Sequence, residues 1–413
     1  MAIYSGDAAA SDPLFPMSGL DANFKNQHDG FNSSAIWKLS PLHNVYSLTM
    51  QMNFLPLPAA LAVIALSFFA SAPARALAFP GAEGFGANAT GGSKDYPVTN
   101  LDDSGPGSFR DAVSAPGRNI VFKVSGTIKL KSECSIDSNT TIDGTTAPSP
   151  GITVTGFSTS VSKKSNIIIR NIRFREDESG DKHKCTLQGT GSSNIIIDHC
   201  SIEWGRWDCL EFTHGSSDIT VQNCIIGEGI DPQKFGFLID GASNMSTHHN
   251  LFIDNESRNP KDEGNGQYIC NVVYNWGGGG GLIGSHSKAV WKNDIINNFF
   301  MAGPSSKGRF IALCKPTDTW YQTGNFVNTT KSGNATDGDV ATDDQFKSAG
   351  VTLVSAAQFS PPVPVTIDPP QHCYEEVIAG HLGCQPLDEV DQRLIGYVKS
   401  AGKEGQLGKP AKP

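Results

Sequence analysis

Runs of β-branched residues, each led by a short polar segment and followed by a turn, recur along the middle of the chain. Four of them align residue by residue: Ser165–Ile172, Ser193–Cys200, Ser217–Cys224 and Ser243–Asn250. Successive runs begin 28, 24 and 26 residues apart. Long stretches with helical periodicity are absent from this region. A drifting period of this size, with one β-rich run per copy, predicts a parallel β-helix, in which each coil buries its inner face by stacking on its neighbours.

The alignment also predicts columns of equivalent side chains along the axis of the coil. The last residues of the four runs form one column, and the residues before them form another: Ile172, Cys200, Cys224 and Asn250, then Asn171, His199, Asn223 and His249. Buried polar side chains need hydrogen-bond partners. We therefore interpret His199 and His249 as part of a polar ladder in preference to a metal or catalytic role, and expect Cys200 and Cys224 to stack or to form a disulfide.

The flanks of the repeat predict further elements of a single all-β domain. Val98–Val113 is typical of a strand, a turn and a short helix, and the segment 119–130 alternates as a strand does. The β pattern fades after Gly338, and Asp388–Lys399 is typical of a short helix. We expect a β-helix domain over residues 77–345, followed by an extended tail, 346–413, whose helix packs back on the coil.

The N-terminal segment indicates secretion. The apolar stretch from Leu55 to Phe69 has the length of the hydrophobic region of a signal peptide, and small residues follow it. We interpret residues 1–51 as an over-extended gene model and 52–76 as the signal peptide; a membrane anchor is the alternative. All nine cysteines follow this segment, which favours disulfides with one thiol left over, and Cys373 with Cys384 is a candidate pair.

Charge limits the class of partner. The formal net charge of −9 argues against nucleic acid, because nucleic-acid-binding proteins present a basic face. If the partner is itself a polyanion, local basic residues must override the global charge.

A series of motifs then indicates a family. In chain order they are FPGAEGFGANATGG, NLDDSGPGSFRDAV, IVFKVSGTIKL, TIDGTTAPSPGI, IIIRNIRFRE, IIIDHCSIEWG, ITVQNCIIGEG, THHNLFIDNESRNP and CNVVYNW, over about residues 79–300. This ordered series resembles the pectate lyases of polysaccharide lyase family 1. The resemblance implies a right-handed, single-stranded parallel β-helix that is secreted, extracellular and monomeric. Its partner would be pectate or a related acidic plant cell-wall polysaccharide, with no nucleic acid and, in the mature form, no membrane.

The resemblance implies eliminative cleavage of α-1,4-polygalacturonate. A base removes the proton on C5, the C4–O4 bond breaks, and a 4,5-unsaturated sugar remains. Arg258 falls on the family's proton-abstracting arginine. Lys234 falls on a substrate-binding lysine, and Lys261 is a second cation nearby. The family also implies Ca²⁺, for which hard carboxylate oxygens are suitable ligands. The candidate ligands are Glu211, Asp208 and Asp198.

The sequence departs from the family at three site positions. His183 and Cys185 stand where two aspartates are expected, unless a gap brings in Asp181 or the Asp177–Glu178 pair. Glu263 stands where typical members have a second arginine. With these departures the resemblance implies one of three functions: a pectate lyase with a rearranged calcium site, a calcium-independent, pectin-lyase-like enzyme in which His183, Lys184 or Arg206 supplies charge, or a lyase of another uronate polymer. Two other classes stay open: a non-catalytic β-helix that binds cell-wall polysaccharide, and a glycoside hydrolase with paired carboxylates.

Overall fold

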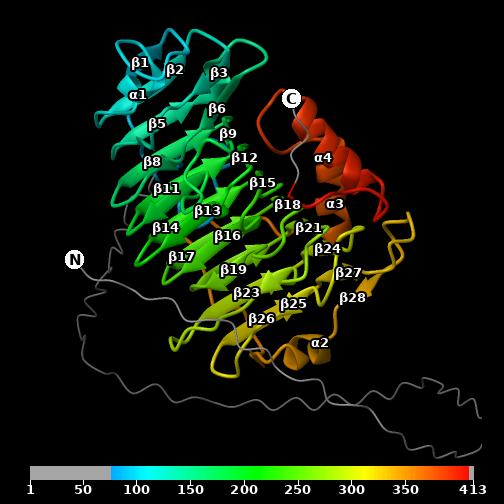
Figure 1. Ribbon diagram of the computed structural model, residues 1–413. Helices are drawn as coiled ribbons and strands as arrows, with labels where there is room; N and C mark the ends of the chain where they lie inside the picture. The colour runs from blue at the N-terminus through cyan, green and yellow to red at the C-terminus, as the bar shows by residue number, and fades with distance from the viewer. Residues whose placement is uncertain (1–75, 409–413) are drawn as a thin grey trace, which may run out of the picture. The chain divides into compact units, whose positions relative to one another are not determined.

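The computed structural model describes residues 76–408. The expectations for residues 1–51, and for 52–76 apart from its last residue, lie outside the described part of the chain. Within it, the chain winds through three β-sheets in turn and repeats the circuit one coil further along, so that equivalent strands stack (Figure 1). This is the parallel β-helix that the repeats predict.

From β2 (Arg118–Phe122) to β25 (Ile311–Ala312), each coil contributes one strand to each sheet. The first sheet contains β1 (Lys94–Val98), β2 (Arg118–Phe122), β5 (Thr140–Asp143), β8 (Ser165–Arg170), β11 (Ser193–Asp198), β14 (Ser217–Gln222), β17 (Ser243–His248), β20 (Gly266–Ile269), β23 (Lys292–Ile296), β26 (Thr319–Thr323) and β29 (Thr352–Leu353).

The second sheet contains β3 (Gly126–Lys129), β6 (Ile152–Gly156), β9 (Arg173–Glu176), β12 (Ser201–Glu203), β15 (Ile225–Gly227), β18 (Leu251–Ile253), β21 (Val272–Tyr274), β24 (Phe299–Met301), β27 (Phe326–Asn328) and β28 (Asp339–Val340). The last pair, β27 with β28, is antiparallel.

The third sheet contains β4 (Cys134–Ser135), β7 (Thr159–Ser160), β10 (Leu187–Thr190), β13 (Asp208–Thr213), β16 (Phe235–Asp240), β19 (Lys261–Glu263), β22 (Leu282–Ile283) and β25 (Ile311–Ala312). The helices are α1 (Phe109–Ala112), a short 3₁₀ turn (Gly144–Thr146), α2 (Asp343–Ser348), α3 (Pro370–Ala379) and α4 (Glu389–Lys399).

The register of the first sheet matches the sequence alignment. Ser193 pairs with Ser165 on one side and with Ser217 on the other, and Ser217 pairs with Ser243. The inward residues Ile167, Ile195 and Ile219 consequently stack in the core. Outward isoleucines of the same strands are buried as well, because the segment around Phe79 and Ala87 packs over them. This explains why these strands are apolar on both faces.

The turn that leaves the first sheet has the same conformation in successive coils. Its first residue is left-handed in every case, with φ between 49° and 57° at Asn171, His199, Asn223, His249, Cys270 and Asn297. Asparagine tolerates this region better than most residues do. The position therefore selects side chains by their backbone preference and leaves them free to project from the turn.

The ladder predicted for His199 and His249 is not formed there, because these side chains bond Asp198 and Asp368 instead. A polar ladder forms at the next position of each coil. The side-chain amide of each asparagine donates to the side-chain oxygen of the asparagine one coil further along. The N···O distance is 3.0 Å from Asn250 to Asn271, 3.1 Å from Asn271 to Asn298 and 2.9 Å from Asn298 to Asn325. All four asparagines are fully buried. Cys224 continues the column, since its backbone N–H donates to Asn250 Oδ1 at 2.9 Å. Cys200 and Cys224 stack without a disulfide, and the backbone N–H of Cys200 donates to Cys224 Sγ at 3.4 Å.

The C-terminal segment runs back along the coil, with α3 and α4 beside the second sheet (Figure 1). Buried Arg175 on β9 contacts Asp388 and Asp391 at the start of α4. Further along α4, Arg393 binds Glu228 through two hydrogen bonds of 2.8 Å. The predicted short helix therefore exists and lies on the coil, as expected.

Other expectations need correction. All nine cysteines are free thiols, so the pairing of Cys373 with Cys384 is not formed. Cys384 lies beside Ser201, to which its backbone N–H donates at 3.1 Å, while Cys373 lies beside His249 and Cys270. Strand pairing also continues past residue 345, because β29 adds to the first sheet. Across residues 76–408, the structure contains no helix with the length and apolar character needed to cross a membrane.

Candidate active site

Three neighbouring strands of the third sheet bring the predicted residues together. Strand β13 pairs with β16 and β16 with β19, so that Glu211, Leu238 and Lys261 lie side by side on successive coils. Neighbouring strands are about 4.8 Å apart, so the backbones of Glu211 and Lys261 are about 10 Å apart. Leu210 points into the core, and the alternation of the strand turns Glu211 outward. The outer face of the third sheet therefore carries the candidate site.

Arg258 reaches this face by the pairing of the preceding residues. Phe235 lies between Asp208 on one coil and Ser257 on the next. Arg258 Nη1 donates to Asp208 Oδ2 at 2.8 Å, and its guanidinium carbon lies 4.1 Å from the centroid of the Phe235 ring. The Arg258 side chain is 16% exposed, whereas that of Asp208 is fully buried. An ion pair and a cation–π contact thus hold the guanidinium in place without covering it.

Asp208 is the most strongly perturbed acid of this group. Burial raises the pKa of Asp208 to about 8, the Glu211 carboxylate adds to the rise, and the Arg258 guanidinium opposes it. Its second oxygen, Oδ1, is buried and has no hydrogen-bond partner among the described residues. A buried carboxylate oxygen without a hydrogen-bond partner lowers the stability of the folded protein. This oxygen is therefore a position where a proton or a cation would be stabilising.

Glu211 and Cys185 complete a small cluster around Asp208. One ligand atom from each of the three residues lies within 4.8 Å of the others. Cys185 Sγ lies 3.4 Å from Glu211 Oε2 and donates to it. Carboxylate oxygens are ligands that Ca²⁺ prefers, whereas a thiol is not. Two converging carboxylates, one with an unpartnered oxygen, fit Ca²⁺, but the protein supplies fewer oxygens than the ion's usual six to eight ligands.

The two predicted lysines lie differently with respect to this cluster. Lys261 lies close enough that its charge lowers the pKa of Asp208, and its Nζ is 3.1 Å from Glu263 Oε2. Lys234 precedes Phe235 at the start of β16, and its Nζ binds Asp231 at 2.9 Å. Lys261 is therefore part of the cluster, while Lys234 lies at its edge.

Asp198 lies in another part of the coil. It ends β11 of the first sheet, where its buried carboxylate accepts hydrogen bonds from Arg170, His199, Gln222 and Asn223. These partners outweigh burial and lower the pKa of Asp198 to about 2. The structure does not bring Asp198 to the cluster of Asp208 and Glu211, and it gives this carboxylate a structural role at the turn.

The residues that depart from the family pattern, and the cations near them, have specific contacts in the structure. His183 packs against Trp207, with ring centroids 6.0 Å apart, and Lys184 pairs with Glu133. Arg206 donates to backbone oxygens of residues 178 and 180. Glu263 accepts hydrogen bonds from the backbone of residues 286 and 287 and holds that loop. Of the two positions where an aspartate was expected, Cys185 lies in the cluster with Asp208 and Glu211.

The pairing of Asp208 with Arg258 was not predicted from the sequence. The 50 residues between them equal two coil lengths of the repeat, and this signal would have placed them on one column. A second group, His249, Cys270 and Cys373, was missed as well. Cys270 occupies the left-handed turn position of the coil after His249, but the helix that carries Cys373 has no place in the repeat.

Comparison with known proteins identifies the family. The chain is 39% identical over 348 residues to the probable pectate lyase C of Neosartorya fischeri, covering 84% of this chain and 82% of that protein. The chain belongs to the pectate lyase family. The probable pectate lyase C of Aspergillus terreus is 39% identical over 334 residues, 80% of this chain and 79% of the relative. No family model matches the chain.

Solved structures share the fold. The pectate lyase of Paenibacillus sp. 0602 superimposes with a TM-score of 0.53 at 16% identity, over 77% of this chain and 98% of that one. Jun a 1, the major allergen from cedar pollen, gives a TM-score of 0.52 at 17% identity, over 78% and 92%. At these identities the likeness concerns the β-helix itself.

Proposed function

We propose that this pectate lyase relative cleaves pectate, the α-1,4-linked polymer of galacturonate, by β-elimination. The observation that carries the proposal is Arg258, held by Asp208 on the outer face of the third sheet beside Glu211, in a chain that aligns with probable pectate lyases over most of its length. The reaction needs a base near C5 and positive charge near the substrate carboxylate, because the C5 proton is weakly acidic.

Arg258 is the proposed base. A guanidinium is charged at ordinary pH and must lose a proton before it can accept one. Asp208 Oδ2 accepts the hydrogen bond from Arg258 Nη1, and burial raises the pKa of Asp208 to about 8, so at neutral pH Asp208 is largely protonated and stabilises the Arg258 charge less than a carboxylate would. A weaker ion pair lowers the cost of a neutral Arg258, which would take the C5 proton as the C4=C5 double bond forms and the C4–O4 bond breaks, with O4 leaving as an alkoxide that solvent protonates.

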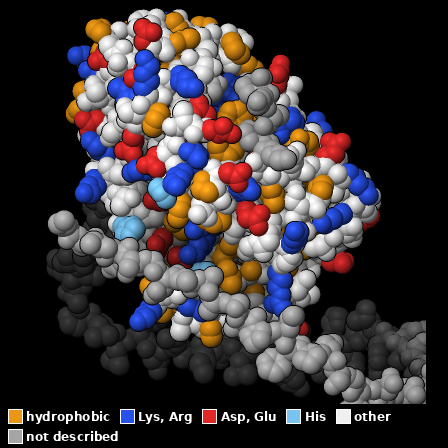
Figure 2. All heavy atoms as spheres, in the orientation of Figure 1, with side chains coloured by type: hydrophobic (Ala, Val, Ile, Leu, Met, Phe, Trp, Pro, Cys, Tyr) orange, Lys and Arg blue, Asp and Glu red, His pale blue; other side chains and the backbone are white. Residues whose placement is uncertain are grey.

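Substrate binding falls to the local cations. The Lys261 ammonium would bind a galacturonate carboxylate, and Lys234 would bind a second one further along the polymer. On the face seen in Figure 2, basic side chains are interspersed with acidic ones and form no broad basic surface. Recognition of a polyanion by a chain of net charge −9 therefore depends on these few residues.

Calcium would be held by Asp208 and Glu211, together with carboxylates of the substrate. Bound there, the ion would neutralise the substrate carboxylate and stabilise the charge that develops on it. Cys185 replaces the third carboxylate, and this observation favours a second candidate: a lyase with weak or no dependence on calcium. We also infer secretion, because the proposed substrate is an extracellular polymer.

One assay separates these functions. The protein is incubated with polygalacturonate, methylated pectin or glucuronan, with Ca²⁺ or with a chelator, and both ultraviolet absorbance and reducing ends are measured. A lyase produces the two signals together, since each cleavage creates an unsaturated end. Reducing ends without absorbance would show hydrolysis. Neither signal on any polymer, with retained binding, would show a non-catalytic protein. Activity that survives the chelator would identify the calcium-independent candidate.

A further inference from the structure

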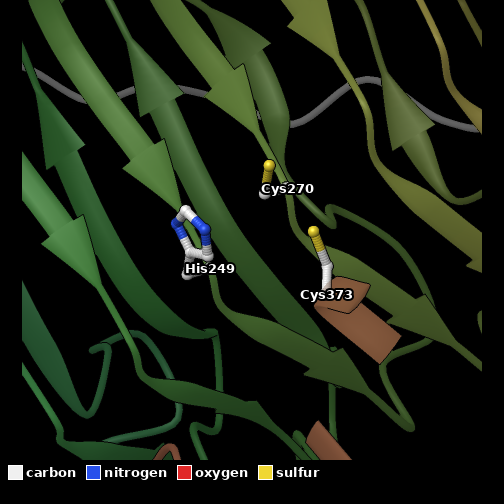
Figure 3. A group of neighbouring side chains, drawn as sticks. All are labelled: His249, Cys270 and Cys373. Atoms are coloured by element: carbon white, nitrogen blue, oxygen red, sulfur yellow. The ribbon is translucent and has the colours of Figure 1, made fainter. Parts of the chain in front are cut away.

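A second cluster of ligand-type side chains lies away from the third sheet. His249 follows β17, Cys270 follows β20, and Cys373 lies on α3; one ligand atom from each is within 4.8 Å of the other two. Figure 3 shows the three side chains facing a common space. The two cysteines are buried, and His249 is largely covered. The cluster joins two successive coils to the C-terminal helix.

We propose that His249, Cys270 and Cys373, with Asp368, form a binding site for a zinc-like transition-metal ion. The nearest oxygen of Asp368, Oδ2, lies 3.1 Å from His249 Nε2. Two sulfurs, an imidazole nitrogen and a carboxylate oxygen are the ligand types of tetrahedral Zn²⁺. With Zn–S near 2.3 Å and Zn–N near 2.0–2.1 Å, such a site spaces its ligand atoms by about 3.3–3.8 Å. In the structure the ligand atoms of His249, Cys270 and Cys373 lie within 4.8 Å of one another, so a small contraction would close them around an ion.

The surroundings of the cluster favour metal ligation. The backbone N–H of Asp368 donates to Cys270 Sγ at 3.1 Å, an interaction that stabilises a thiolate. His248 Nδ1 lies 2.9 Å from His249 Nδ1. His248 is fully buried, and its ring packs edge-on against that of His249 with centroids 5.2 Å apart. The contact with His248 orients the His249 ring, with Nε2 3.1 Å from Asp368 Oδ2.

The same position in neighbouring coils shows that the cluster is not required by the fold. Asn171, Asn223 and Asn297 occupy the turn position of His249 and Cys270 with the same left-handed backbone. Asparagine would therefore suffice at both positions for the turn alone. A bound ion would join the coil to α3 and so fasten the C-terminal segment, which is a structural role separate from lyase chemistry on the third sheet.

Cobalt(II) is a suitable probe, because thiolate-to-cobalt charge transfer reports the ligand type directly. The full chain, reduced and freed of metal, is titrated with Co²⁺ and then with Zn²⁺. We expect one equivalent of Co²⁺ to bind with charge-transfer and tetrahedral ligand-field absorption, Zn²⁺ to displace it, and Zn²⁺ to raise the melting temperature. His249→Asn, Cys270→Asn and Cys373→Ala should each weaken binding at least a hundredfold.

A cysteine outside the cluster provides the control. Cys314→Ser changes a partly buried cysteine outside the cluster and should leave the cobalt spectrum unchanged. Far-ultraviolet circular dichroism checks that each variant is folded, and the two asparagine variants place at the turn a residue that this turn already accepts. Cobalt uptake that is unaffected by all three substitutions would overturn the proposal. So would the absence of stoichiometric uptake by the reduced protein, or a Cys270–Cys373 disulfide that forms in its place.

Discussion

Replacing Asp208 with asparagine tests the electrostatics on which the proposed base depends. Asp208 is fully buried, and its pKa rises from the ordinary 3.8 to about 8. Between these two values the folded protein retains a proton that the unfolded chain has lost. The wild-type protein therefore loses stability as the pH rises through this window, and Asp208→Asn does not. At low pH the neutral acid and the amide are nearly isosteric, so the two proteins should be similar there.

The size of this stability difference follows from the interval between the pKa values of Asp208 in the unfolded and the folded protein. Each pKa unit corresponds to 1.36 kcal/mol, so a rise of about four gives an upper limit of about 6 kcal/mol. Water reaching the partly exposed Arg258 and local relaxation will reduce this value. We expect the free energy of unfolding of Asp208→Asn, relative to that of the wild type, to increase by at least about 2 kcal/mol between pH 5 and pH 8.

Urea unfolding at a series of pH values, with a chelator present, provides the measurement. Asp198→Asn is the control, because the pKa of Asp198 is lowered to about 2. The stabilisation from that carboxylate is present above pH 4 and is lost only as the pH falls toward 2, so the deficit of Asp198→Asn should not grow as the pH rises from 5 to 8. A constant difference between the wild type and Asp208→Asn over this range would refute the reasoning.

Three further predictions concern the ladder, the substrate and calcium. Asn298→Ala removes the acceptor for Asn271 and the donors to Tyr268 O and Asn325 Oδ1, so the free energy of urea unfolding should fall by at least about 3 kcal/mol. Asn119→Ala, the control, breaks one exposed hydrogen bond and should cost under about 1 kcal/mol. Equal losses for the two variants would contradict the stabilising role of the ladder. Lys261→Ala should raise KM for polygalacturonate about tenfold or more, because one charged contact is lost. Lys292→Ala, which alters an exposed lysine, should leave KM unchanged. An unaltered KM for Lys261→Ala would exclude Lys261 from substrate binding. Cys185→Asp adds a carboxylate beside Asp208 and Glu211 and should lower the Ca²⁺ concentration for half-maximal activity; a calcium titration unaffected by it would place the ion elsewhere.

The repeating part of the molecule was predictable because its signal is local and periodic. The aligned serines, the stacked isoleucines and the asparagine ladder follow from residues that recur at one coil length. The outward Ile168 and Ile196 were part of the same runs, but their cover is the distant segment around Phe79. No periodicity connects that segment to them, so their burial was visible only in the structure.

The site was predictable in its members but not in its arrangement. Motif position indicated Arg258, Lys261, Asp208 and Glu211, and the structure brings these four together. Asp198 resembled them in the sequence, yet it ends a strand of another sheet. Placing it required knowledge of which of the three sheets each strand joins. The cluster around Cys270 depends on α3, whose docking is governed by ion pairs such as Arg175 with Asp391 and not by the repeat.

The most direct test of the central claim is the initial rate of ultraviolet absorbance on polygalacturonate for the wild type and for Arg258→Lys. Lysine keeps the positive charge but lacks the geometry of the guanidinium, so the rate should fall by about 10²–10⁴, the usual contribution of a general base. Arg309→Lys, which alters an exposed arginine bonded to Ser348, should retain the full rate. Full activity of Arg258→Lys would contradict the assignment of the base, and no absorbance from the wild type on any uronate polymer would contradict the lyase itself.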